Sequence, residues 1–126
     1  MTPRTTGLLM LVAAMAVESF AQLFLKVGAA GGPRILAAPY RDFAGKSRLG
    51  SLPSSWVVLG VLAYGLEIFF YTQALKRLDV SVAFPLGSLC FVGVAFLSRL
   101  FLGEAVGRVR WLGVGCILAG TFLMTL

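Results

Sequence analysis

Three polar residues, Glu18, Gln22 and Lys26, recur at intervals of four within an otherwise apolar run near the start of the chain. Helix positions four apart lie on one face, so these side chains should form a polar stripe. A charge near the middle of a bilayer costs at least about 2.5–3.5 kcal/mol, so the stripe should face protein or a watery cavity. One interpretation of Glu18 is an internal ion pair, with Lys26 reaching toward the interface. The other, which we favour, is that Glu18 binds either a proton or a cationic substrate group.

A second carboxylate, Glu67, lies in a later apolar run between Tyr64 and Tyr71. The two tyrosines stand at i−3 and i+4, on the same side of a helix as Glu67. A tyrosine hydroxyl can donate to a carboxylate, so a structural hydrogen bond is one interpretation. Two intramembrane carboxylates in one small protein instead favour a polar pathway. The residues predicted to contact a sugar or a proton are Glu18, Gln22, Glu67, Tyr64 and Tyr71.

The composition places these residues in a membrane protein. Of the 126 residues, 59% are apolar and 13% are charged, whereas soluble domains are about 45–50% apolar and about 25% charged. A soluble domain of this size could not bury so much apolar surface. We expect one all-α integral membrane domain over residues 1–126, with four transmembrane helices at about 7–29, 55–75, 80–100 and 107–126. The first run is too long, and too charged at Glu18, for a cleaved signal peptide.

The connections predict the orientation of the chain. Residues 31–54 form the one long loop, rich in Gly, Pro and basic residues, and its Tyr40 and Phe43 should rest at the lipid interface. The next two connections are short, and Asp79 or Ser81 should cap the third helix. The first and third loops hold seven basic residues: Arg34, Arg41, Lys46, Arg48, Arg99, Arg108 and Arg110. The N-terminus and second loop hold three, so loops 1 and 3 should be cytoplasmic and both termini periplasmic.

The third and fourth spans carry residues that shape helices. Pro85 removes a backbone hydrogen bond and Gly87 adds freedom, which predicts either a packing kink or a hinge. The fourth span contains small residues that allow close helix approach, either within one subunit or at a dimer seam. These residues are Gly113, Gly115, Ala119 and Gly120.

Several kinds of chemistry are excluded. The chain has no His, and Cys90 and Cys116 lie in apolar runs where buried thiols are expected. A His-containing metal site, a disulfide framework and a Cys–His nucleophile are therefore absent. Because no nucleophile–base pair or phosphate-cradling loop occurs, we expect no enzyme, no catalytic residues, no metal and no cofactor. Basic and aromatic residues do not interleave, so nucleic acid is not an expected partner.

Two segments resemble known membrane proteins. The carboxylate eight residues before Lys26, and the run "GVGCILAGTFLM" at 113–124, resemble the first and fourth, dimer-forming helices of small multidrug resistance transporters. Residues 78–124 resemble more closely the small subunits of the flippase for aminoarabinose-linked undecaprenyl phosphate. The shared features are Ala83-Phe84-Pro85, Ser88-Leu89, Phe91-Val92, the Glu104 turn, and Trp111 with Gly113; Gln22 and Lys26 match that branch too.

Two departures accompany the resemblance. Multidrug members have a tryptophan where Gly87 aligns, and that ring stacks on flat aromatic cations, so glycine argues against a drug site. The flippase subunits have no carboxylate at the position of Glu18, although an amino sugar would give this carboxylate a natural ligand.

The resemblance implies a small multidrug resistance-like bundle of the drug/metabolite transporter superfamily, forming a homodimer or a heterodimer with a similar subunit. It implies transport of a polyprenyl-phosphate-linked amino sugar across the bacterial inner membrane. Lys26 and Arg41 would neutralise the phosphate, and the prenyl tail would remain among membrane lipids beside Pro85, Gly87 and Ser88. Two alternatives stay open. One is a proton-coupled exporter of small cations, and the other is a non-transporting partner subunit of another membrane protein.

Overall fold

The computed structural model describes residues 2–46, 48 and 52–126, and all of the regular structure among them is helical. The elements in chain order are α1 (Pro3–Ala29), the short 3₁₀ helix η1 (Pro33–Ile35), α2 (Ala38–Gly45), α3 (Pro53–Leu75), α4 (Val80–Leu86), α5 (Leu89–Phe101) and α6 (Arg108–Thr125). The predicted all-α fold is confirmed, and the helix ends lie within a few residues of the predicted ones.

Within the described ranges, three helical segments are long and apolar enough to cross a membrane: Pro3–Ala29, Pro53–Leu75 and Val80–Phe101. The fourth predicted span, α6, forms where expected, over 18 residues. It is not among the three candidate spans. Arg108 and Arg110 occupy its first turn and lower the hydropathy of so short a helix. That α6 crosses the membrane stays a prediction.

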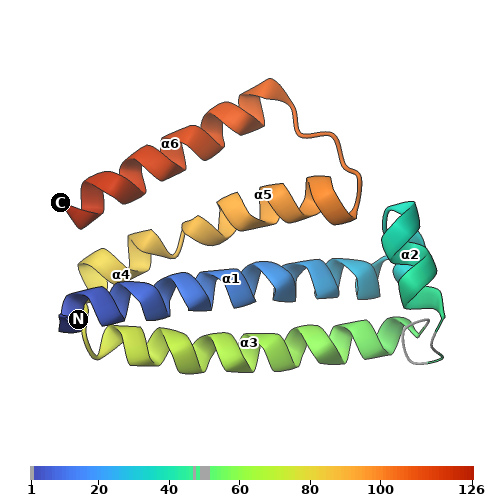
Figure 1. The fold of residues 1–126 in the computed structure, drawn as a ribbon, viewed down its shortest axis with the longest axis horizontal. Coiled ribbons are helices and arrows are strands. Elements are labelled where there is room, and N and C mark those ends of the chain that lie inside the picture. Colours follow the sequence, from blue (N-terminus) through green and yellow to red (C-terminus); the bar gives the residue numbers. More distant parts are fainter. Residues whose placement is uncertain (1, 47, 49–51) are drawn as a thin grey trace.

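Helix α1 lies at the centre of the bundle, with α3 along one side and α4 and α5 along the other (Figure 1). Helix α6 runs beside α4 and α5, and only Val114 of this helix is buried. Both termini lie at one end, where the Arg4 guanidinium donates to the Thr125 carbonyl at 2.6 Å. The α1–α3 connection and the α5–α6 connection lie at the opposite end, so the basic loops share one side.

Glycines allow α1 and α3 to pack closely. A β-carbon on Gly60 of α3 would lie 2.9 Å from Leu25 and 3.2 Å from the Ala21 carbonyl oxygen. Apolar burial in lipid adds no driving force between helices, so this close van der Waals contact stabilises the pair.

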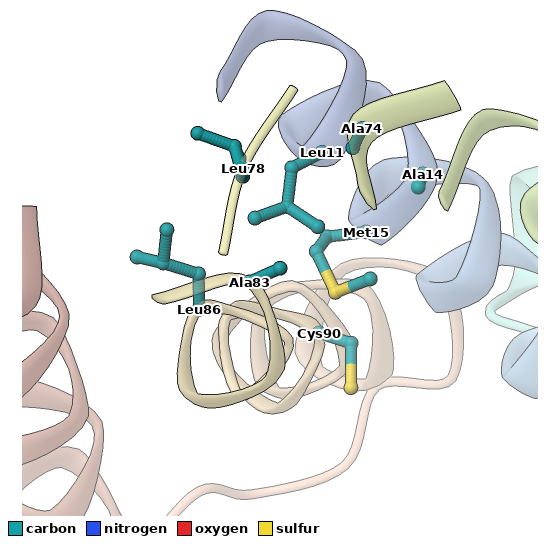
Figure 2. Close-up of a cluster of buried hydrophobic side chains, with 8 residues drawn as sticks. All are labelled: Leu11, Ala14, Met15, Ala74, Leu78, Ala83, Leu86 and Cys90. Atoms are coloured by element: carbon teal, nitrogen blue, oxygen red, sulfur yellow. The ribbon is translucent and has the colours of Figure 1, made fainter. Parts of the chain in front are cut away.

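A buried cluster joins the helices near the end of the bundle that carries the termini (Figure 2). Its members are Leu11, Ala14, Met15, Ala74, Leu78, Ala83, Leu86 and Cys90, which come from α1, the end of α3, the turn after it, α4 and α5. Cys90 is therefore buried as predicted. Cys116 is exposed, contrary to the prediction, because most of α6 has no neighbour in the described part of the chain.

The predicted loop at 31–54 is more ordered than expected, since it contains η1 and α2. Gly31 and Gly32 end α1 with φ values of 93° and 117°, which favour glycine. Proline in this segment does not prevent helix formation, because Pro33 and Pro39 lie in the first turns of η1 and α2, where proline is well tolerated. The Ala37 N–H donates to the Phe101 carbonyl at 2.7 Å, which ties the segment to the end of α5.

The third span is interrupted where the sequence predicts a kink. Helix α4 ends at Leu86 and α5 begins at Leu89. Asp79 occupies the N-cap position of α4 as expected, but its side chain makes no capping hydrogen bond. The interruption lies alongside α1 (Figure 1).

Candidate functional site

A cavity of about 600 Å³ lies between α1, α3 and the interruption of the third span. It brings together six of the predicted site residues: Glu18, Glu67, Tyr71, Pro85, Gly87 and Ser88. Met15, Phe84, Cys90 and Phe91 complete its lining. The cavity therefore combines two carboxylates with aromatic rings and the irregular backbone of the third span.

Glu18 and Glu67 reach this cavity from different helices, α1 and α3, and both side chains are partly buried. Within the described part of the chain, neither carboxylate forms an ion pair, so the internal pair considered for Glu18 is not formed here. Tyr71 lines the same cavity. Two carboxylates that line one cavity favour the binding of a cationic group there.

The backbone of the third span forms one wall of the cavity. The Ser88 hydroxyl donates to the Pro85 carbonyl at 2.7 Å. Non-helical backbone at membrane depth is tolerated where it lines a cavity or is buried in protein. A β-carbon on Gly87 would lie 2.9 Å from the Phe84 carbonyl oxygen and 3.8 Å from Met15 Sδ. A tryptophan at position 87 would therefore require this wall to move.

The polar stripe of α1 is divided between two cavities. Glu18 lines the cavity described above, whereas Gln22 and Lys26 line a second one of about 290 Å³. The second cavity lies between α1, α5 and the α5–α6 connection, and its polar lining also includes Ser98 and Glu104. Each step of four residues turns the side chain by about 40° around the helix axis. Gln22 and Lys26 therefore point progressively away from the direction of Glu18 and line the cavity beside α5.

Two predicted site residues lie elsewhere. Tyr64 accepts a hydrogen bond from the Gln22 amide, so it joins α3 to α1 and does not pair with Glu67. Arg41 is exposed on α2 and is not part of the lining of either cavity. The phosphate roles of Lys26 and Arg41 are therefore not supported by a shared site in this structure.

The small residues of α6 do not pack within the subunit. Gly113, Gly115, Ala119 and Gly120 are all exposed. A β-carbon on any of the three glycines would meet no described atom within 4 Å. Of the two interpretations of these residues, contact within one subunit is not observed.

Ser19, which lies beside Glu18, is buried and is not one of the predicted site residues. Its hydroxyl donates to the Met15 carbonyl at 2.8 Å and lies 3.4 Å from the Cys90 carbonyl on α5. Gly93 of α5 faces it directly. The sequence feature that could have identified Ser19 is its small size together with that of Gly93, because small residues in two spans allow the helices to approach closely.

Comparisons with known proteins agree with this architecture. Residues 5–126 match the EamA-like transporter family. The probable 4-amino-4-deoxy-L-arabinose-phosphoundecaprenol flippase subunit ArnE of Yersinia pestis (strain Pestoides F) is 35% identical over 80 residues, which cover 64% of this chain and 70% of the relative. The protein of the same name from Yersinia pseudotuberculosis (serotype O:1b, strain IP 31758) gives the same values.

A third relative of that name, from Aeromonas hydrophila subsp. hydrophila, is 38% identical over 73 residues, covering 58% of this chain and 64% of the relative. No solved structure matches the chain. The family match extends over nearly the whole chain, and the relatives are transporter subunits, not enzymes. With its apolar helices and its internal carboxylates, the chain belongs to the EamA-like transporter family.

Proposed function

We propose that the protein is a subunit of a flippase that moves a polyprenyl-phosphate-linked amino sugar across the bacterial inner membrane. The observation that carries this proposal is the cavity in which Glu18 and Glu67 meet without an ion-pair partner among the described residues. Intramembrane ionisable residues are retained mainly where a substrate or ion passes. The relatives, whose names specify an aminoarabinose-phosphoundecaprenol substrate, support the choice of substrate class.

In this proposal the ammonium group of the sugar binds between the carboxylates of Glu18 and Glu67. Tyr71 contributes a hydroxyl for hydrogen bonds to the sugar, at the edge of the same cavity. Lys26, in the second cavity, contacts the phosphate, since a charge-assisted hydrogen bond to phosphate is among the stronger polar contacts. Arg41 assists from α2 when the headgroup first arrives at that end of the bundle.

The protein acts as a dimer, with itself or with a similar subunit. Four helices enclose little space, and α6 leaves its small residues uncovered. A second subunit packed on α6 would bury them, as small residues in membrane interfaces generally are. The excess of basic residues supports an orientation with the α1–α3 and α5–α6 connections in the cytoplasm and both termini in the periplasm.

Transport of the lipid-linked amino sugar in reconstituted vesicles tests this function. Glu18→Gln and Glu67→Gln keep the shape of each side chain and remove its charge, so each should reduce the transport rate at least about tenfold. Asp42→Asn is the matched control, because this carboxylate is exposed on α2, away from the cavity. If both cavity variants transport at the rate of the parent protein, the assignment of the carboxylates is wrong. A non-transporting partner subunit would give that result while its partner is present.

A second function, export of hydrophobic cations, is favoured by the rings of Phe84, Phe91 and Tyr71 in the same cavity. Aromatic faces attract cations, and a carboxylate supplies the opposite charge. Tetraphenylphosphonium binding that Glu18→Gln abolishes, without transport of the lipid-linked sugar, would favour the exporter.

A further inference from the structure

A third cavity, separate from the two described above, lies where α2 packs on the bundle. It has a volume of about 230 Å³. Six aromatic residues line it: Phe20, Phe24, Tyr40, Phe43, Trp56 and Phe101. We refer to it as the aromatic hollow. Its remaining lining is also apolar, so it offers almost no polar group to a ligand.

Four helices build the wall of the aromatic hollow through a chain of ring contacts. Trp56 contacts Phe24 at a centroid distance of 5.9 Å, and Phe24 contacts Phe20 at 6.3 Å. Phe20 contacts Phe101 at 6.4 Å, and Phe101 contacts Tyr40 at 4.5 Å. The rings are tilted or edge-on to one another, as aromatic pairs prefer. The wall is therefore formed by rings that pack against one another at different angles, so its surface is not flat.

The rim of the hollow is accessible from outside the bundle. Phe43 of α2 lines it, although 78% of this side chain is exposed. The hydrogen bond from the Ala37 N–H to the Phe101 carbonyl holds the start of α2 against the end of α5. The position of the rim is therefore set by a contact between helices. A large apolar ring that stays exposed on an amphipathic helix indicates contact with lipid or with an apolar ligand.

The aromatic hollow adjoins the cavity that contains Lys26. Leu23 lines both of them, with Gln22 and Lys26 on the polar side. The end of the molecule that carries both includes the α1–α3 and α5–α6 connections, and eight basic residues lie in or near these connections: Lys26, Arg34, Arg41, Lys46, Arg48, Arg99, Arg108 and Arg110. It has two acidic ones, Asp42 and Glu104, and Glu104 lines the Lys26 cavity. An apolar hollow next to a polar cavity that contains Lys26, at a basic end of the molecule, matches an amphiphile with an anionic head.

We propose that the aromatic hollow binds the first isoprene units of a polyprenyl phosphate, with the phosphate held at Lys26 in the adjoining cavity. This inference rests on the proposed function and adds a site for the lipid chain that differs from the Gly87 side of the bundle. The remainder of the chain lies in the bilayer beyond Phe43.

Shape decides the selectivity of such a site. Acyl tails are as apolar as the hollow, so transfer from lipid supplies no hydrophobic gain and only the quality of packing distinguishes ligands. An isoprenoid chain carries regular methyl branches and double bonds, which fit between tilted rings better than a straight polymethylene chain. The hollow should therefore prefer an isoprenoid phosphate over a linear alkyl phosphate.

Tryptophan fluorescence in lipid nanodiscs tests the proposal. The chain has two tryptophans, so Trp111→Phe leaves Trp56, in the wall of the hollow, as the only one. Farnesyl phosphate should change its emission saturably. Dodecyl phosphate should bind at least about tenfold more weakly, and inorganic phosphate should give no change. Equal binding of dodecyl and farnesyl phosphate, or a change that does not saturate, would overturn the isoprenoid assignment.

Matched variants locate the ligand. Ala44 lines the hollow and Ala38 is exposed on the same helix outside that lining. Ala44→Phe fills the hollow and should weaken farnesyl phosphate binding at least about tenfold, whereas Ala38→Phe should leave it unchanged. Lys26→Gln, which does not alter the hollow, should weaken farnesyl phosphate but not farnesol. Binding to Ala44→Phe at parental affinity would overturn the proposal.

Transport and binding measurements on the same variants distinguish failure of this lipid-chain site from failure of the proposed function. Glu18→Gln and Glu67→Gln alter a separate cavity and should leave farnesyl phosphate binding intact. If these variants also transport normally, the carboxylate mechanism fails while the chain site stands. If they stop transport but Ala44→Phe binds normally, the function stands and the chain site fails.

Discussion

Ser19 on α1 lies directly against Gly93 on α5, so that a β-carbon built on Gly93 would overlap the Ser19 hydroxyl. This contact sets the distance between the two helices beside Glu18. The Ser19 hydroxyl also donates to the Met15 carbonyl, which holds its rotamer. The width of the adjoining cavities therefore depends on two small residues, one of which, Ser19, also lines the cavity that contains Lys26.

Gly93→Ala should destabilise the protein by about 1–3 kcal/mol, because the added methyl group forces α1 and α5 apart. Thermal unfolding in detergent measures this. Combining it with Ser19→Gly, which removes the overlapping hydroxyl and the Ser19 β-carbon, should restore most of the loss. Gly65→Ala is the matched control, since a β-carbon there meets no described atom within 4 Å. Equal stability of Gly93→Ala and Gly65→Ala would contradict the contact.

The hydrogen bond from Gln22 to Tyr64 should contribute modestly to the packing of α1 on α3. A double-mutant cycle with Gln22→Leu and Tyr64→Phe should give a coupling free energy of about 0.6 kcal/mol, and no more than about 1.7 kcal/mol. Unfolding in bicelles provides the four measurements. A parallel cycle of Gln22→Leu with Tyr71→Phe, whose ring lies in the other cavity, should give no coupling.

Helix α6 should form a contact between subunits, and Cys116 reports on it. This thiol is exposed near the middle of α6 and shares a helix face with Gly113 and Gly120. In a Cys90→Ser background, mild oxidation of membranes should cross-link a homodimer through Cys116, in parallel or antiparallel arrangement. Gly120→Leu should prevent the cross-link, because it adds bulk beside the thiol.

Gly115→Leu provides the comparison, since residue 115 lies about 100° around α6 from Cys116, on a neighbouring face. Loss of the cross-link in Gly115→Leu alone would move the seam to that face. Cross-linking only to a different subunit would identify a heterodimer. No cross-link with any partner would contradict a seam on the Cys116 face.

Pro85→Ala should straighten the third span. The new N–H can donate to the Ser81 carbonyl one turn earlier, which should stabilise the helix by about 1 kcal/mol or more. If the interruption is needed for transport, the variant should unfold at a higher temperature and transport more slowly. Ser81→Ala, which keeps the interruption, should change neither property greatly. An unchanged transport rate in a stabilised Pro85→Ala variant would favour the packing kink over the hinge.

Much of the local structure was predictable because it depends on neighbours in sequence. The interruption of the third span follows from Pro85 and Gly87, whose backbone properties act within one turn. The order in residues 31–54 was not predictable in this way. Pro39 lies in the first turn of α2. The helix is held in place because Tyr40 packs on Phe101, some sixty residues later in the chain.

The candidate site was predictable in its residue types and only partly in its arrangement. A carboxylate within a membrane span indicates a polar environment around it, so Glu18 and Glu67 could be predicted as site residues from the sequence. Both line one cavity. The partner of Tyr64 could not be chosen, because the i−3 spacing places it near Glu67 while the rotation of α3 turns it toward Gln22. The spacing of residues along the sequence determines the angles between their side chains around one helix. It does not determine which neighbouring helix those side chains face.

The sequence by itself determined the membrane class, the positions of the helices and the residues able to bind charge. These properties follow from the length of apolar runs, from proline and glycine, and from the high free energy of charges in lipid. Only the tertiary structure decided that the α1 stripe is shared between two cavities, that six rings form a hollow beneath α2, and that the small residues of α6 stay uncovered. Those outcomes depend on the rotation and close approach of helices, which contacts between distant residues such as Ser19 and Gly93 establish.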